Sequence, residues 1–358
     1  MKNKTYFAII LIFILGFVGN SKVCFDAVRS ALELCCHAVI PSLFPFLVIS
    51  KITIELGLAH SIARRFESTM RTFFHLPGSS AVAFIIGILS GYPVGAKIVV
   101  TLYEEKLCSE NDAEQMLAFC NNSGPLFIIG TVGTAMLGSI QTGIILYSIH
   151  VLSAITVGLL FRGAGASHTD RRFIHYKTSL LSDSLTKSIL ESVHTIILIC
   201  GYVVFFAAII AVLRIFGFFS TTAVIFNKLG IPPEITESFL AGLIEISSGC
   251  TALSLSSAPL PLISFIVAWS GISAIAQVGG IIGKSRLSLK CFAISKLVHG
   301  IIAAIYTVIF IKFRPALPIF STQKNRLQVI AVGWIPLLLY IFLLIIILIM
   351  FSKNHRKQ

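Results

Sequence analysis

Long stretches without formal charge alternate with short polar segments along the chain. About 20 apolar residues are enough for a helix to cross the hydrocarbon core of a bilayer. The pattern therefore predicts several membrane-spanning helices. Six stretches carry no formal charge: 72–96, 116–140, 139–161, 192–213, 246–283 and 328–351. A seventh, 291–311, carries one, Lys296.

The N-terminus resembles a signal peptide, because Lys2 and Lys4 precede an apolar run at 6–19. No A-x-A cleavage pattern follows that run. We therefore expect residues 1–20 to form an uncleaved first transmembrane helix.

Glycine, proline and polar residues interrupt several of the uncharged stretches. GILSGYPVGA covers 87–96 and FCNNSGPLF covers 119–127, while EISSGC covers 245–250 and WSG covers 269–271. Non-helical backbone at membrane depth is tolerated only against protein or a water-filled cavity. These segments are predicted to be broken or re-entrant helices, with structural breaks at Gly91, Pro93, Gly95, Pro125, Gly249 and Gly271.

The two halves of the chain carry an internal repeat. NNSGPLFIIGTVG at 121–133 aligns with AWSGISAIAQVGG at 268–280, which places Ser123-Gly124 on Ser270-Gly271. Each half reads as a span, a glycine-broken segment, a span with a polar centre and a plain span. Paired interrupted segments in two halves are typical of secondary transporters, whose binding site lies where the broken segments meet.

Composition supports the membrane assignment. Hydrophobic residues make up 56% of the 358 and charged residues only 12%, about half of the usual charged fraction of a soluble domain. The net charge of +13 could indicate nucleic-acid binding, but no basic stripe with interleaved aromatic residues is present. The excess of Lys and Arg instead fits cytoplasmic loops of a membrane protein.

The distribution of Lys and Arg orients the halves. With a cytoplasmic N-terminus and re-entrant broken segments, eighteen cations fall inside and eight outside, and Lys97 and Lys296 stay at membrane depth. The halves then have opposite orientations. The basic loop at 312–326 is placed outside and does not fit this rule.

The sequence thus predicts an all-α polytopic membrane protein with two inverted-topology repeats, about eight transmembrane helices and two re-entrant hairpins. The expected segments are an N-terminal helix at 1–20, a first repeat at 21–161, a cytoplasmic linker at 162–187, a second repeat at 188–313 and a C-terminal helix at 327–352.

The break of the first half is a candidate substrate site. Asn121, Asn122, Ser123 and Gly124 offer amide and hydroxyl donors and acceptors. A helix restarting at Pro125 would direct free N–H groups at the midplane, where they could bind a carboxylate. The alternative is a helix kink whose polar groups are satisfied by neighbouring helices.

Two charged residues lie beside the breaks. Lys97 could bind an anionic substrate, or its ammonium could extend to the membrane surface. Glu245 could couple transport to a proton or sodium ion, or it could form a salt bridge with Lys97 or Lys296.

The second half offers weaker candidates, because serine is common at helix contacts in membranes. The two histidines His150 and His299 are read as packing residues rather than ligands. The candidate binding residues of this half are Ser247, Ser248, Ser270, Ser273 and Gln277.

Enzyme and cofactor motifs are missing from the sequence. The eight cysteines form no CxxC pair, and no histidine cluster has zinc-ligand spacing. VGGIIGKS at 278–285 approaches a P-loop, but Val278 stands in place of its first glycine. We expect no enzymatic activity, no metal and no cofactor apart from an unassigned coupling ion.

The segment 87–133, GILSGYPVGAKIVVTLYEEKLCSENDAEQMLAFCNNSGPLFIIGTVG, closely resembles a family of sporulation integral membrane proteins. EISSGC and WSGISAIAQVGG in the second half fit the same family, and the resemblance covers roughly residues 25–312. This family belongs to the nucleoside-recognition, or Gate, group, which is similar to concentrative nucleoside transporters. The binding motifs of those transporters are missing, so only their hairpin architecture carries over.

The resemblance implies a protein of the outer forespore membrane of an endospore-forming bacterium, which moves dipicolinic acid from the mother cell towards the forespore. Its partners would be a small anionic substrate and membrane lipid, without nucleic acid, and homo-oligomers are left open. The alternatives are a scaffold of the spore envelope and a transporter of nucleosides or another small organic anion.

Overall fold

The computed structural model describes residues 2–55, 58–163, 181–256, 258–283 and 285–313. Every element in these ranges is a helix, and no strand occurs among them. The predicted C-terminal helix at 327–352, most of the linker at 162–187 and most of the basic loop at 312–326 lie outside the described residues.

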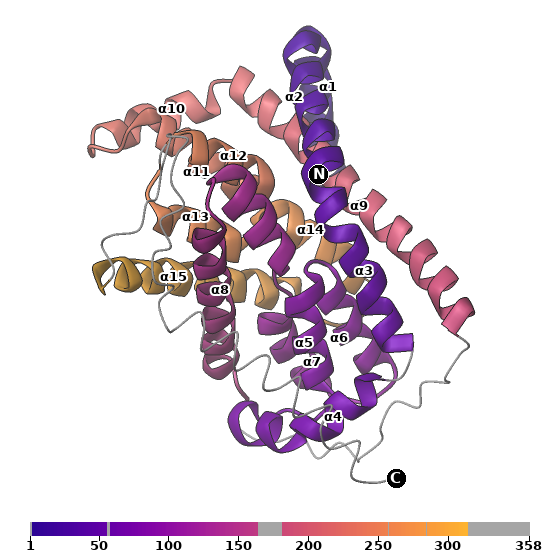
Figure 1. Ribbon diagram of the computed structural model, residues 1–358. Helices are drawn as coiled ribbons and strands as arrows, with labels where there is room; N and C mark the ends of the chain where they lie inside the picture. The colour runs from indigo at the N-terminus through magenta and orange to yellow at the C-terminus, as the bar shows by residue number, and fades with distance from the viewer. Residues whose placement is uncertain (1, 56–57, 164–180, 257, 284, 314–358) are drawn as a thin grey trace.

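The helices fall into an N-terminal group and two halves (Figure 1). The N-terminal group is α1 (Lys2–Gly19), α2 (Ser21–Leu34) and η1 (Cys35–Val39). The first half is α3 (Ile40–Glu55), α4 (Leu58–Thr69), η2 (Met70–Phe74), α5 (Ser80–Ser90), α6 (Val94–Glu104), α7 (Glu110–Cys120), η3 (Leu126–Met136) and α8 (Ile140–Leu160). The second half is α9 (Leu181–Ile215), α10 (Phe218–Asn227), α11 (Pro233–Ile244), α12 (Ile246–Leu255), α13 (Leu260–Trp269), α14 (Gly271–Ile282) and α15 (Leu289–Phe313).

Four helical segments are long and apolar enough to cross a membrane. They are Ile140–Leu160, Asp183–Ile215, Leu260–Ile282 and Leu289–Phe313. A fifth span arises if Ile10–Gly19 and Ser21–Val39, which meet at a bend of 96°, count as one. The described chain therefore supports four or five spans, and the expected number of about eight is not confirmed.

The two halves share one order of elements. Each contains two pairs of short helices, α5/α6 and α7/η3 in the first and α11/α12 and α13/α14 in the second. Each then ends in one long helix, α8 or α15, and these two helices contact each other (Figure 1). The opposite orientation of the halves remains a prediction.

Local sequence explains where the broken helices begin and end. The hydroxyl of Ser109 accepts from the N–H of Asp112, whose carboxylate accepts from the N–H of Ser109, and this capping box starts α7. Asn121 is extended and ends α7, and the chain becomes helical again at Pro125, as the sequence predicted. In the second half Pro233 lies in the first turn of α11.

Glycines allow the broken helices to cross closely. A methyl group on Gly87 would lie 1.8 Å from the carbonyl oxygen of Cys120, and one on Gly95 would lie 2.2 Å from the same atom. In the second half a methyl group on Gly249 would lie 2.0 Å from the Cα of Gly242. These crossings hold the broken helices of each half close together.

Candidate substrate-binding site

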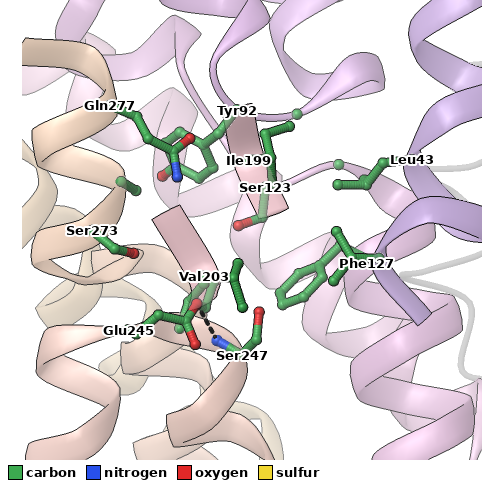
Figure 2. A pocket seen from close by; sticks show the side chains of 15 residues that line it. Leu43, Tyr92, Ser123, Phe127, Ile199, Val203, Glu245, Ser247, Ser273 and Gln277 are labelled. Carbon is green, nitrogen blue, oxygen red and sulfur yellow. Dashed lines mark hydrogen bonds between the residues drawn. The ribbon is translucent and has the colours of Figure 1, made fainter. Parts of the chain in front are cut away.

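A central cavity of about 60 Å³ lies where the breaks of both halves meet (Figure 2). Broken helices of both halves and the long helix α9 contribute to its wall. Its lining residues are Val39, Leu43, Gly91, Tyr92, Ser123, Gly124, Phe127, Ile199, Val203, Glu245, Ile246, Ser247, Ser273, Ala274 and Gln277.

The first half contributes two breaks that touch each other. Gly91 has φ +80°, and a methyl group there would lie 2.9 Å from the backbone nitrogen of Gly124. Both requirements favour glycine at this position. Ser123 is held between the halves, because its N–H donates to His150 Nε2 at 3.2 Å and its hydroxyl donates to the carbonyl of Val267 at 3.3 Å.

The second half places a carboxylate at the cavity. Glu245 is fully buried and extended, and it accepts from the N–H groups of Ser247 at 2.9 Å and Ser248 at 2.7 Å. Its charge is thereby directed at the N-terminus of α12, which favours an anion. Within the described residues no ion pair joins Glu245 to Lys97 or Lys296, so the salt-bridge alternative is not observed.

The remaining residues of the second half divide between lining and support. Ser273 and Gln277, one helical turn apart on α14, face the cavity together with Ser247 (Figure 2). Ser248 supports Glu245 through its backbone and does not line the cavity. Ser270 also lies outside the lining, where its hydroxyl bonds the hydroxyl of Tyr92 and so ties the halves together.

The two asparagines hold the first break and do not line the cavity. Asn121 Oδ1 accepts from the N–H of Ala96 at 3.2 Å. Asn122 Nδ2 donates to the carbonyl of Phe119 at 2.6 Å, so it bonds the last turn of α7. Each amide thus satisfies one backbone group of the break, while Asn121 Nδ2 is buried without a partner among the described residues.

Lys97 also lies away from the central cavity. Its side chain is 59% exposed, and its Nζ is 3.7 Å from an oxygen of Glu191 on α9. It lines a separate, larger cavity beside α6. The structure thus brings six of the predicted residues together and separates them from Lys97; the six are Ser123, Gly124, Glu245, Ser247, Ser273 and Gln277.

A buried polar cluster behind the cavity was missed by the sequence analysis. Lys296 on α15 is fully buried, and its Nζ donates to Asn122 Oδ1 and to His299 Nδ1, both at 3.2 Å. His299 Nε2 donates to the carbonyl of His150 at 3.0 Å, because a carbonyl only accepts. This geometry fits the neutral tautomer of His299 that carries its proton on Nε2 and accepts from Lys296 at Nδ1.

This cluster joins the break of the first half to the last helix of the second. No carboxylate lies within 4 Å of Lys296 Nζ among the described residues, so two neutral acceptors hold it. Its Nζ also lies 5.6 Å from the ring centre of Tyr92, a residue of the cavity wall. A buried amine without a carboxylate is costly to keep, which marks Lys296 as a functional candidate.

Two signals in the sequence point to this cluster. Lys296 is the single charge in the stretch 291–311. His150 and His299 occupy similar places in the last helices of the two halves. Their rings lie 4.7 Å apart between centres in the structure.

Comparison with known proteins supports the resemblance found in the sequence. Residues 36–162 match the Gate family, described as nucleoside recognition. The chain is similar to the sporulation integral membrane protein YlbJ of Bacillus subtilis (strain 168), with 28% identity over 87% of this chain and 82% of that protein. Together with the apolar spans, these similarities identify an integral membrane protein. The comparison with solved structures gave no match.

Proposed function

We propose that this protein is a sporulation membrane transporter for a small organic anion, with dipicolinic acid as its substrate. The observation that carries the proposal is the central cavity at the meeting point of the broken helices. A scaffold has no need for polar groups of two halves converging on one buried cavity. The similarity to a sporulation membrane protein and to the Gate family supplies the biological setting.

The cavity offers several groups that can bind a carboxylate. The hydroxyls of Ser247 and Ser273 and the amide of Gln277 are donors on its wall, and the hydroxyl of Ser123 joins them when its bond to the carbonyl of Val267 breaks. These donors come from helices of both halves. Motion of one half against the other would therefore change the donor set and open the cavity to alternate sides of the membrane.

Glu245 sets a condition on anion binding. Two like charges about 4 Å apart repel by about 4 kcal/mol at an effective dielectric constant near 20. An anion next to Glu245 would meet such repulsion unless the carboxylate were neutralised. We therefore propose that a proton or a sodium ion at Glu245 accompanies the substrate.

Uptake of labelled dipicolinate into proteoliposomes tests the proposal. Wild-type protein should accumulate dipicolinate, and Ser273→Ala combined with Gln277→Leu should weaken uptake about 10-fold or more, because two bonds to a charged ligand are lost. Ser148→Ala is the matched control, since that hydroxyl bonds only within α8 and lies outside the cavity.

The competing functions give different results in the same assay. A nucleoside transporter would accumulate labelled nucleoside and ignore dipicolinate. A scaffold would move neither, and its variants would change only the abundance or assembly of spore-membrane proteins. Absence of dipicolinate uptake by folded wild-type protein, under both a proton and a sodium gradient, would refute the proposed substrate.

The inverted arrangement of the halves has its own test. Cysteines introduced into the linker at 162–187 should react with an impermeant reagent from the cytoplasmic side, as the charge distribution predicts. Cys36 is the exposed natural cysteine among the described residues and is replaced first. Reaction from the opposite side alone would exclude the arrangement.

A further inference from the structure

A second cavity of about 320 Å³ lies beside the central one and is lined by several charged groups. Lys51 on α3, Lys97 on α6, and Glu191 and His194 on α9 line it. We call it the outer cavity. Lys51 is only 8% exposed although it lies near the end of its helix, so its ammonium is held inside the protein.

Cationic groups in the outer cavity outnumber the acidic group that pairs with them. Lys51 Nζ lies 2.8 Å from Glu191 Oε2, and Lys97 Nζ lies 3.7 Å from the same oxygen. One carboxylate oxygen is thus shared by two ammonium groups, and the pair with Lys97 is long. An anion entering the cavity would supply the second partner that Lys97 lacks at short range.

Three segments of the chain contribute residues to both the outer and the central cavity. Tyr92 lines the central cavity and the next residue, Pro93, lines the outer one. On α9 the neighbours Ile199 and Leu198 divide in the same way. On α14, Gln277 faces the central cavity and Ile281, one turn later, faces the outer one. The two cavities are therefore consecutive along the same three elements.

We propose that the outer cavity is a second anion-binding site, in which Lys51 and Lys97 hold a small dicarboxylate before it reaches the central cavity. Binding at the outer site follows from its own charges, whereas its place on a transport route rests on the proposed function. The positive-inside distribution puts Lys51 on the cytoplasmic side, so the site would load from the cytoplasm.

Equilibrium binding of dipicolinate to the purified full-length protein in nanodiscs of neutral lipid tests the site. Lys97→Gln should weaken binding about 10-fold, because a charge-assisted hydrogen bond becomes a neutral one. Glu191→Gln should tighten binding, since it removes the carboxylate that competes for the two lysines. The variants thus shift affinity in opposite directions, which misfolding would not produce.

Two controls sharpen the result. Lys290→Gln removes an exposed cation at the start of α15 and should leave the affinity unchanged. A neutral pyridine analogue should bind wild type and Lys97→Gln equally. Lys51→Met should weaken dipicolinate binding as well. In the double variant Lys51→Met with Glu191→Gln, no glutamate is left without its lysine partner.

Each outcome has one meaning. Unchanged dipicolinate affinity in Lys97→Gln and Glu191→Gln would overturn the outer site even if wild type transports dipicolinate. Opposite shifts in affinity without any uptake by wild type would keep the site and refute the proposed function. A third outcome is that dipicolinate does not bind in neutral nanodiscs, while anionic lipid co-purifies with wild type and not with Lys97→Gln. That result would assign the cavity to a lipid headgroup and overturn the proposal.

Discussion

The breaks of the two halves solve one problem by different means. A helix that ends at membrane depth leaves backbone groups that need partners, because lipid offers none. In the second half Glu245 satisfies the N-terminus of α12 with its own carboxylate. In the first half two asparagine amides hold the break, and Lys296 reaches Asn122 from the other half of the chain.

The difference shows which break has its hydrogen-bond partners within its own segment. The partners of Glu245 are two and three residues away, so this break is complete within its own segment. Asn122 bonds Phe119 within its own segment, but its other partner, Lys296, is 174 residues away, so the first break is complete only when the halves meet. Motion between the halves would therefore disturb the first break and leave the local structure of the second intact.

The largest effect is expected where backbone crosses backbone in either half. Gly87→Ala and Gly249→Ala would each place a methyl group within 2.0 Å of backbone atoms that cannot rotate away. We expect each to destabilise the protein by about 1–3 kcal/mol or more. Thermal unfolding in detergent measures this. Gly130→Ala, which meets nothing within 4 Å, is the control, and equal losses in all three variants would refute the argument.

The next test separates the roles of the two halves. Lys296→Met removes the donor that joins them, and we expect uptake to fall about 10-fold or more at matched protein level. Stability should change little, because loss of two hydrogen bonds is offset by removal of a costly buried amine. A double-mutant cycle with Asn122→Ala, measured on the free energy of unfolding, should show a coupling of about 0.5–3 kcal/mol. Additive effects of the two substitutions would show that the two side chains do not interact.

Glu245→Gln examines the break that is complete by itself. The amide oxygen can still accept from an N–H of α12, so we expect a loss of stability of about 1 kcal/mol. Exchange of dipicolinate across the membrane should continue, whereas accumulation driven by a proton or sodium gradient should stop. Gradient-driven accumulation at the wild-type level would show that Glu245 only caps its helix.

The smallest effect is expected at a tie within the first half. The hydroxyl of Tyr147 on α8 donates to the carbonyl of Ile88 near the end of α5 at 3.0 Å. Tyr147→Phe should cost about 0.5–1.5 kcal/mol and leave uptake nearly unchanged, because a single neutral hydrogen bond is lost. Thermal unfolding and uptake measured on the same preparation check both parts. A large loss of uptake at normal stability would give Tyr147 a direct role.

The sequence by itself determined the features that depend on neighbouring residues. Apolar stretches with at most one charge located the spans 140–160 and 289–313, and the NNSGP motif located a helix end at Asn121 and a restart at Pro125. The polar residues of the broken segments included Ser123, Ser273 and Gln277, which line the cavity, whereas Ser270, which aligns with Ser123, does not. Apolar length, Gly and Pro act locally, so their consequences can be read along the chain.

The tertiary structure alone decided which polar groups meet. Lys97 follows the first broken segment, yet it faces Glu191, 94 positions along the chain and on another helix. Lys296 is an isolated charge in an apolar helix until α15 packs against the first half and brings it to Asn122. Spacing along a helix fixes the face on which a side chain lies, but the partner across the contact depends on how distant helices pack.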